Sequence, residues 1–173
     1  MANFDLGPLP KKITGGCNCG GIRYTVNFPE GHDFKYASTT CQCTQCRRNV
    51  SGLFSMYHRV PWSAITWDSK ETWKDYYLSK GNSRPFCREC GSYMGWRAEG
   101  GPNMSIAIGT VDPLYLFGEG WEESGGEVPR GGFGRALANS CGYHEWTRNE
   151  IPGVTDNLEM VGCNGRGERR PED

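Results

Sequence analysis

Short stretches of the chain alternate between apolar and polar residues, which is typical of strands with one buried face. The clearest stretch runs from Ile22 to Phe28 and reads Ile-Arg-Tyr-Thr-Val-Asn-Phe. We expect further short strands, mostly bounded by turn residues, at 34–40, 53–60, 73–78, 93–98 and 104–108. The last two are expected to pair with each other around the turn Glu99-Gly-Gly-Pro. The pattern therefore predicts a mainly β fold.

Glycine and proline content supports this prediction. The 25 glycines and 10 prolines make up about 20% of the 173 residues, against a usual ~12%, and they disfavour long helices. A chain of this length is typical of one domain. We expect a flexible N-terminal arm at 1–12, a single domain at 13–161, and a disordered polar tail at 162–173. The Gly- and Glu-rich segment 118–134 is expected to be a mobile surface loop.

The charge of the chain is balanced, with 19 Lys and Arg residues against 20 Asp and Glu residues. Proteins that grip a phosphate backbone are normally basic, so we expect no nucleic-acid partner. No run of 18 apolar residues occurs, so we expect no membrane span. The first residues lack the layout of a signal peptide, which favours a cytoplasmic location.

Nine cysteines are the unusual feature of the composition, and seven of them fall into three tight clusters. In a reducing compartment these thiols are expected to stay reduced, so metal binding explains the clusters better than a disulfide framework does. Cys163, in the polar tail, is expected to be a bystander. Zinc is the metal that thiolates select most naturally here, and iron–sulfur chemistry is a weaker alternative because the spacing is not a ferredoxin pattern.

Two of the clusters are pairs. Cys17 and Cys19 are two residues apart, so on an extended backbone both side chains point to the same face. Cys87 and Cys90 form a CxxC followed by Gly91, the form of a zinc knuckle. Two pairs supply four sulfurs, enough for a closed tetrahedral site of the structural kind.

The third cluster, Cys41, Cys43 and Cys46, offers three thiols within six residues. A zinc ion held by three protein ligands keeps a position open, which is typical of catalytic sites. A fourth ligand could instead close this site, and the candidates are His58, Cys141 and His144.

Three arginines lie beside the cysteine clusters. Arg47 and Arg48 follow the three-cysteine cluster, and Arg88 lies inside the CxxC. Their simplest role is to neutralise the charge of zinc thiolates. Arg47 and Arg48 are also candidates for binding the carboxylates of an anionic substrate, because a guanidinium can bind a carboxylate through two hydrogen bonds.

The cysteine motifs resemble those of the glutathione-dependent formaldehyde-activating enzyme family, which also contains the centromere protein V-like proteins. The resemblance covers about residues 13–112. It rests on four segments in order: Gly16-Cys-Asn-Cys-Gly-Gly-Ile-Arg-Tyr24, Cys41-Gln-Cys-Thr-Gln-Cys-Arg47, Phe86-Cys-Arg-Glu-Cys-Gly-Ser92 and Gly109-Thr-Val-Asp112.

This resemblance implies a β-tent fold, a set of small antiparallel sheets organised around two zinc ions per chain. It implies a structural zinc on Cys17, Cys19, Cys87 and Cys90, and a catalytic zinc on Cys41, Cys43 and Cys46. The reaction it implies joins glutathione, the co-substrate, to formaldehyde, which in reverse is a carbon–sulfur lyase reaction. The expected partners are therefore a small thiol and a small aldehyde.

The last third of the chain departs from the family pattern. Family members usually carry an apolar strand and an aromatic-proline segment here, whereas this chain has Leu137-Ala-Asn-Ser-Cys-Gly-Tyr-His-Glu-Trp146 followed by Ile151-Pro-Gly. A relative that acts on another thiol adduct or electrophile would keep the zinc ligands and change this part. The same cysteine motifs also fit a non-catalytic binding module with two structural zinc ions, and less well a redox or metal-storage role for the thiols.

Overall fold

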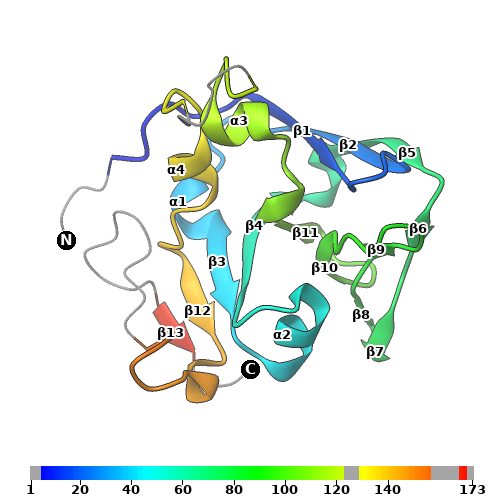
Figure 1. Cartoon of the computed structure of the whole chain (residues 1–173), viewed down its shortest axis with the longest axis vertical. Helices are drawn as coiled ribbons and strands as arrows, with labels where there is room; N and C mark the ends of the chain where they lie inside the picture. The colour runs from blue at the N-terminus through cyan, green and yellow to red at the C-terminus, as the bar shows by residue number, and fades with distance from the viewer. Residues whose placement is uncertain (1–4, 123–128, 157–167, 171–173) are drawn as a thin grey trace.

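The computed structural model describes residues 5–122, 129–156 and 168–170. The fold is mainly β, as predicted, with three sheets and several very short helices (Figure 1). The cysteine clusters lie at the ends of strands and in the turns that follow them.

The largest sheet has eight strands in the order β13, β12, β3, β4, β11, β10, β8 and β7. Most neighbours are antiparallel, but β12 pairs in parallel with both β3 and β13. In chain order the strands are β3 (Ser38–Cys41), β4 (Ser55–Pro61), β7 (Tyr77–Ser79), β8 (Asn82–Ser83), β10 (Gly95–Ala98), β11 (Asn103–Ala107), β12 (Tyr143–Glu145) and β13 (Glu168–Arg170).

A second sheet has three antiparallel strands in the order β1, β2, β5, and a third pairs β6 with β9. Along β2 every second side chain is fully buried, which is the alternation that the sequence showed. These side chains pack with Met94, Met104 and Ile106 in the main core. The strands are β1 (Lys12–Gly16), β2 (Ile22–Asn27), β5 (Ile65–Lys70), β6 (Trp73–Lys74) and β9 (Phe86–Cys87).

All helices in the described ranges are short, in agreement with the glycine and proline content. The longest, α2, has seven residues, and two residues separate its start from the end of β3. The α-helices are α1 (Phe34–Ala37), α2 (Thr44–Val50), α3 (Pro113–Phe117) and α4 (Gly134–Leu137), and the 3-10 helices are η1 (Trp62–Ala64), η2 (Ile108–Thr110) and η3 (Thr147–Asn149).

The predicted strands at 22–28, 53–60, 93–98 and 104–108 correspond to β2, β4, β10 and β11, and the last two pair as expected. The strand predicted at 34–40 is wrong in its first half. The Asp33 side chain accepts hydrogen bonds from the N–H groups of Lys35 and Tyr36 and so starts α1 there. The strand predicted at 73–78 is divided, because β6 pairs with β9 and β7 with β8.

Two predicted mobile segments are only partly described. The structure describes 118–122 and 129–134 of the expected loop, and α4 begins at Gly134. Within the expected tail, Glu168–Arg170 forms β13 and pairs with β12. Cys163 and the other residues of the tail lie outside the described residues, as do residues 1–4 of the expected arm.

Candidate metal centres and active-site pocket

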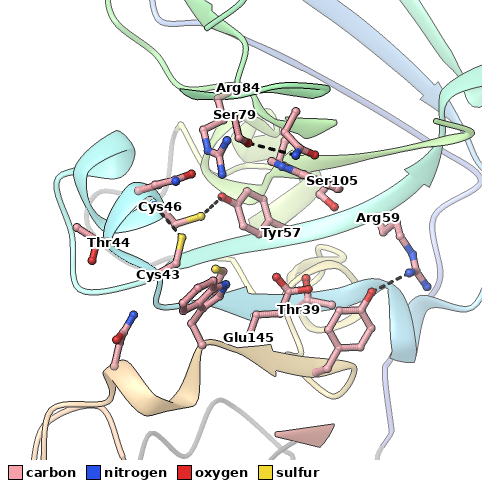
Figure 2. Close-up of a pocket in the computed structure, with 17 residues that line it drawn as sticks. Thr39, Cys43, Thr44, Cys46, Tyr57, Arg59, Ser79, Arg84, Ser105 and Glu145 are labelled. Atoms are coloured by element: carbon pink, nitrogen blue, oxygen red, sulfur yellow. Dashed lines mark hydrogen bonds between the residues drawn. The ribbon is translucent and has the colours of Figure 1, made fainter. Parts of the chain in front are cut away.

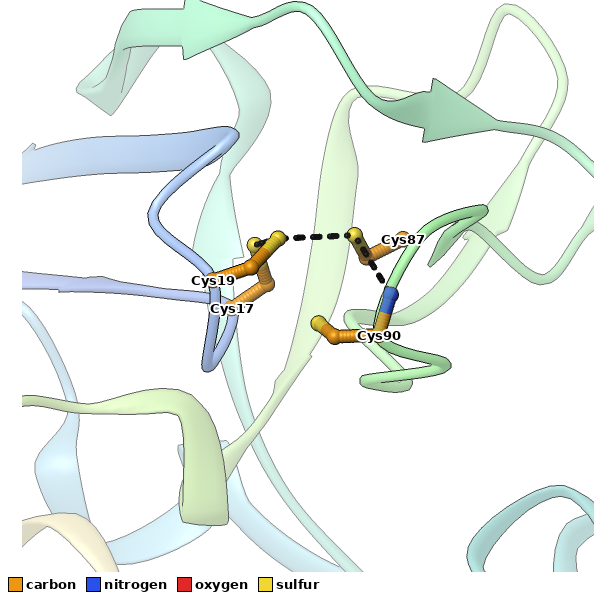
Figure 3. Close-up of side chains that lie close together, drawn as sticks. All are labelled: Cys17, Cys19, Cys87 and Cys90. Carbon is orange, nitrogen blue, oxygen red and sulfur yellow. Dashed lines mark hydrogen bonds between the residues drawn. The ribbon is translucent and has the colours of Figure 1, made fainter.

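Cys17, Cys19, Cys87 and Cys90 converge, although the two pairs are far apart in the sequence (Figure 3). The first pair lies in the turn after β1, and the second lies at the end of β9 and in the turn after it. All four Sγ atoms lie within 4.8 Å of one another. The Sγ atom of Cys19 is 3.5 Å from those of Cys17 and Cys87. These separations are far longer than a disulfide bond and close to the ~3.8 Å expected between thiolates around tetrahedral zinc, given Zn–S bonds of about 2.3 Å.

Hydrogen bonds act unevenly on this cluster. At Cys19 the backbone hydrogen bond from Gly21 lowers the pKa, but the neighbouring thiols outweigh it and raise the pKa to about 12. Elsewhere in the cluster hydrogen bonds favour the thiolate, the form that binds metal. Backbone N–H groups point at two of the sulfurs: Ile22 N lies 3.2 Å from Cys17 Sγ, and Cys90 N lies 3.4 Å from Cys87 Sγ. The Ser92 hydroxyl lies 3.2 Å from Cys90 Sγ and lowers the pKa of Cys90 to about 5. The four residues therefore fit a closed metal site.

Cys41, Cys43 and Cys46 form the second group, and all three are buried. Cys41 ends β3, Cys43 caps α2, and Cys46 lies in the first turn of that helix. The Cys43 sulfur accepts a hydrogen bond from the Cys46 N–H at 3.3 Å, so the cap that starts the helix also gathers the thiols. Sulfur–sulfur hydrogen bonds from Cys41 and Cys46 lower the pKa of Cys43, whereas the pKa values of Cys41 and Cys46 are raised, so one thiolate is favoured in the group before metal binds.

No fourth Cys, His, Asp or Glu completes this group within the described ranges. Each of the three candidates has another role. His58 bonds to His32 and to the Leu137 carbonyl, and the His144 ring bonds to Thr40. Cys141 is disulfide-bonded, which corrects both its candidacy as a ligand and the expectation that the thiols are all reduced. The three sulfurs therefore fit a metal site that leaves a position for an incoming ligand.

The three sulfurs lie in the wall of a cavity of ≈ 750 Å³ (Figure 2). One side of the cavity comes from the last third of the chain, because β12 places Glu145 opposite Cys41. Trp146 follows and packs against the cysteines. The cavity is lined by Thr39, Cys41, Cys43, Thr44, Gln45, Cys46, Tyr57, Arg59, Ser79, Asn82, Arg84, Trp96, Ser105, Tyr143, Glu145, Trp146 and Asn149.

Two tyrosines connect to the cysteine cluster. The Tyr57 hydroxyl lies 3.3 Å from Cys46 Sγ and 3.1 Å from the Tyr93 hydroxyl. Burial raises the pKa of Tyr57 well above its ordinary value, so its hydroxyl stays protonated. A thiolate at Cys46 can only accept, so Tyr57 donates to it and Tyr93 donates to Tyr57. Tyr93 and Tyr57 thus form a series of hydrogen bonds that ends on the Cys46 sulfur.

The arginines are placed differently from the sequence expectation. The Arg47 guanidinium donates to Gln42 Oε1 and to the carbonyls of Leu53 and Asn149. Neither Arg47 nor Arg48 lines the cavity, and Arg88 forms an exposed ion pair with Glu89. Arg84 does line the cavity, and sequence reasoning missed it. Its position three residues before Cys87 was the only signal that could have found it.

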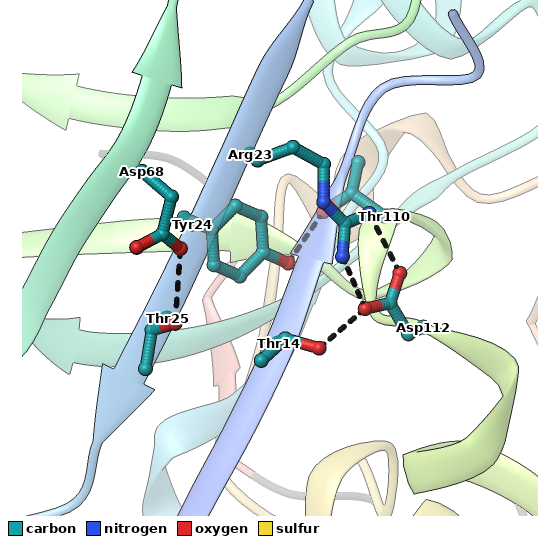
Figure 4. A network of polar contacts seen from close by, with 7 residues as sticks. All are labelled: Thr14, Arg23, Tyr24, Thr25, Asp68, Thr110 and Asp112. Atoms are coloured by element: carbon teal, nitrogen blue, oxygen red, sulfur yellow. Dashed lines mark hydrogen bonds and ion pairs between the residues drawn. The ribbon is translucent and has the colours of Figure 1, made fainter. Parts of the chain in front are cut away.

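Asp112, in the fourth segment of the resemblance, ties the three-stranded sheet to the segment that follows η2 (Figure 4). Its carboxylate accepts hydrogen bonds from the Arg23 guanidinium and the Thr14 hydroxyl. Burial by itself raises the pKa of Asp112, but the hydrogen bonds from Arg23 and Thr14 outweigh it and the pKa is lowered. Asp112 lies outside the cysteine cavity, so we assign it a structural role.

A mainly β scaffold with one four-sulfur and one three-sulfur cluster, the latter beside a cavity, defines the class of cysteine-rich metal-binding β domains. Comparison with family models identifies the family within that class. The model described as "Glutathione-dependent formaldehyde-activating enzyme" matches residues 12–124, and the chain belongs to this family.

Comparisons with individual proteins are less informative. A crystal structure of a Rhodobacter sphaeroides protein from a structural genomics programme is similar at 23% identity and a TM-score of 0.47, covering 68% of this chain and 98% of that chain. Comparison with curated proteins gives no match. Among the described residues, no helix has the length and apolar character needed to cross a membrane.

Proposed function

We propose that the protein is a carbon–sulfur lyase that joins or releases a thiol, glutathione in the first instance, and a small aldehyde. The observation that carries the proposal is the buried group Cys41, Cys43 and Cys46, which lines a cavity and lacks a fourth protein ligand among the described residues. Membership of the glutathione-dependent formaldehyde-activating enzyme family supports the same chemistry.

Cys41, Cys43 and Cys46 would hold a zinc ion, which when bound supplies a positive charge that lowers the pKa of a substrate thiol. In the joining direction a carbon–sulfur bond forms, the sulfur loses its proton, and the former carbonyl oxygen takes up a proton. The chain contributes orientation, since holding both reactants in one cavity replaces a bimolecular encounter. Tyr57 hydrogen-bonds to the Cys46 sulfur and so helps to hold it in place, and Trp146 packs against the cluster.

The test is exchange NMR of glutathione and formaldehyde at equilibrium, with a protein-free sample as the baseline because thiols add to formaldehyde unaided. Wild-type protein should accelerate the exchange, and Cys43→Ser should return it to the baseline. Arg88→Gln is the matched control, since Arg88 is exposed and lies outside the cavity. Equal exchange in wild type and Cys43→Ser would exclude the proposed reaction.

The last third of the chain is the region most able to change which electrophile the cavity accepts. Tyr143, Glu145 and Trp146 line the cavity within the region that departs from the family pattern. The assay should therefore include a second small aldehyde beside formaldehyde. The arm and tail boundaries, a count of two zinc ions and a cytoplasmic location stay predictions.

A further inference from the structure

Arg84 is a buried cation in the cavity wall. It lies in the connection between β8 and β9, and only 8% of its surface is exposed. Its backbone N–H donates to the Tyr76 carbonyl at 2.9 Å, which anchors the residue. The side chain lies on the same side of the cavity as Cys46 and Tyr57 (Figure 2).

Two of the three guanidinium nitrogens of Arg84 are buried without a hydrogen-bond partner among the described residues. These two atoms are Nε and Nη1. The ion pairs found among these residues do not include Arg84 either. A buried, unpaired charge is costly to the folded state, so a guanidinium of this kind in a cavity wall is suited to binding an anion.

Other arginines in the structure show what a satisfied guanidinium looks like. Arg23 pairs with Asp112, and Arg59, which also lines the cavity, donates to the Tyr143 hydroxyl at 2.7 Å. Arg97 has one unpaired nitrogen, but its guanidinium stacks on Trp62 at 3.8 Å from the ring centre. Arg84 is thus distinguished by opening onto the cavity without such a partner.

We propose that Arg84 binds a carboxylate of the substrate, so that the cavity selects thiols that carry a carboxylate. The guanidinium fork matches a carboxylate through two parallel hydrogen bonds. The three-cysteine cluster and Arg84 line one cavity, so one molecule can reach both. This assignment rests on the proposed function for the identity of the thiol, and it replaces Arg47 and Arg48 as the carboxylate-binding residues.

The test measures binding without any aldehyde and without a free thiol, so its result does not depend on the lyase reaction or on metal–thiolate bonding. The probes are S-methylglutathione and its diethyl ester, in which both carboxylates are masked. Titration follows the fluorescence of tryptophan, since Trp96 and Trp146 line the cavity. Wild-type protein should bind the free acid about 10- to 100-fold more tightly than the ester, the range expected for hydrogen bonds to a charged group.

Arg84→Met should remove this preference, Arg84→Lys should keep part of it, and the matched control Arg88→Met, at an exposed arginine outside the cavity, should retain it. Arg84→Met should also leave the melting temperature unchanged or raise it, because the variant loses an unpaired buried charge. A lower melting temperature with the preference retained would show that Arg84 is structural and would overturn the proposal. So would equal binding of acid and ester, or no binding of either, by the wild type.

If Arg84→Met fails to fold, the acid-to-ester ratio in wild type and Arg84→Lys decides the question. The preference can persist in a protein that does not accelerate exchange of glutathione and formaldehyde. In that case the proposed reaction fails and the carboxylate site stands.

Discussion

Loss of the four-sulfur cluster should destabilise the protein much more than loss of the three-sulfur cluster. Cys19 and Cys87 are 68 residues apart in the sequence, so a metal held between the two pairs closes a long loop. The loop-closure relation used for disulfides gives about 4 kcal/mol for a cross-link of this length. The three-sulfur cluster lies within 41–46, and the same relation gives only about 2 kcal/mol for so short a loop.

The perturbation is Cys90→Ser, which removes one metal-binding sulfur and changes the side-chain volume little. For a domain of this size each kcal/mol shifts the melting temperature by about 2–4 °C, so Cys90→Ser should lower it by about 8–16 °C. The matched variant Cys43→Ser should lower it by about half as much. The assay is thermal unfolding by circular dichroism, with zinc per chain measured on the same samples.

A strong chelator supplies the second arm of this experiment. It should bring wild type, Cys90→Ser and Cys43→Ser to similar melting temperatures, because all three then lack both metals. The reasoning is refuted if Cys90→Ser and Cys43→Ser lower the melting temperature equally. It is also refuted if Cys90→Ser keeps the zinc content and melts within about 2 °C of wild type.

Three further outcomes test other parts of the fold. Gly95→Ala should cost about 1–3 kcal/mol of unfolding free energy in urea denaturation, because φ is +141° there and a Cβ would lie 2.1 Å from the Ser105 carbonyl oxygen. Burial lowers the pKa of His58 to about 3, so between about pH 6.5 and pH 3 only the unfolded chain takes up a proton at this residue. The free energy of unfolding should therefore fall towards pH 3 more steeply in wild type than in His58→Gln. Parallel pH curves for the two proteins would contradict this. Asp112→Asn should cost only about 1 kcal/mol, because its partner Arg23 is 38% exposed and solvent screens the pair; a loss above about 3 kcal/mol would show that the pair is effectively buried.

Patterns within short stretches of sequence predicted those strands whose residues alternate between the core and the surface. Alternation predicted β2 because one of its faces meets the core at every second residue. The signals for α1 and α2 are single capping side chains, Asp33 and Cys43, and the spacing of Cys43 pointed to metal binding rather than to a cap. A strand–helix boundary that depends on one hydrogen bond leaves little trace in a pattern of apolar residues.

The cysteine clusters were predictable because the thiols of each cluster are only a few residues apart in the sequence. Tetrahedral zinc needs four ligands, so two pairs of thiols are expected to share one ion. The choice between an open and a closed second site was not predictable in this way. It depended on where His58, Cys141 and His144 lie, and those positions follow from strand pairing. The unpaired state of Arg84 likewise depends on which side chains fail to reach it in three dimensions.

The parallel pairing of β12 with β3 brings the last third of the chain to the three-cysteine cluster. It sets Glu145 beside Cys41 and carries Trp146 to the cysteine cluster. Trp146 has a left-handed backbone with φ of +59°, which costs a non-glycine residue roughly 1–2 kcal/mol. Strand β12 on one side and η3 on the other hold the residue in this conformation. Cys41, Cys43 and Cys46 come from β3 and α2, whereas Glu145 and Trp146 come from β12 and the residue after it. Under the proposed function, side chains of the last third of the chain could therefore change which electrophile is accepted without changing the three sulfurs.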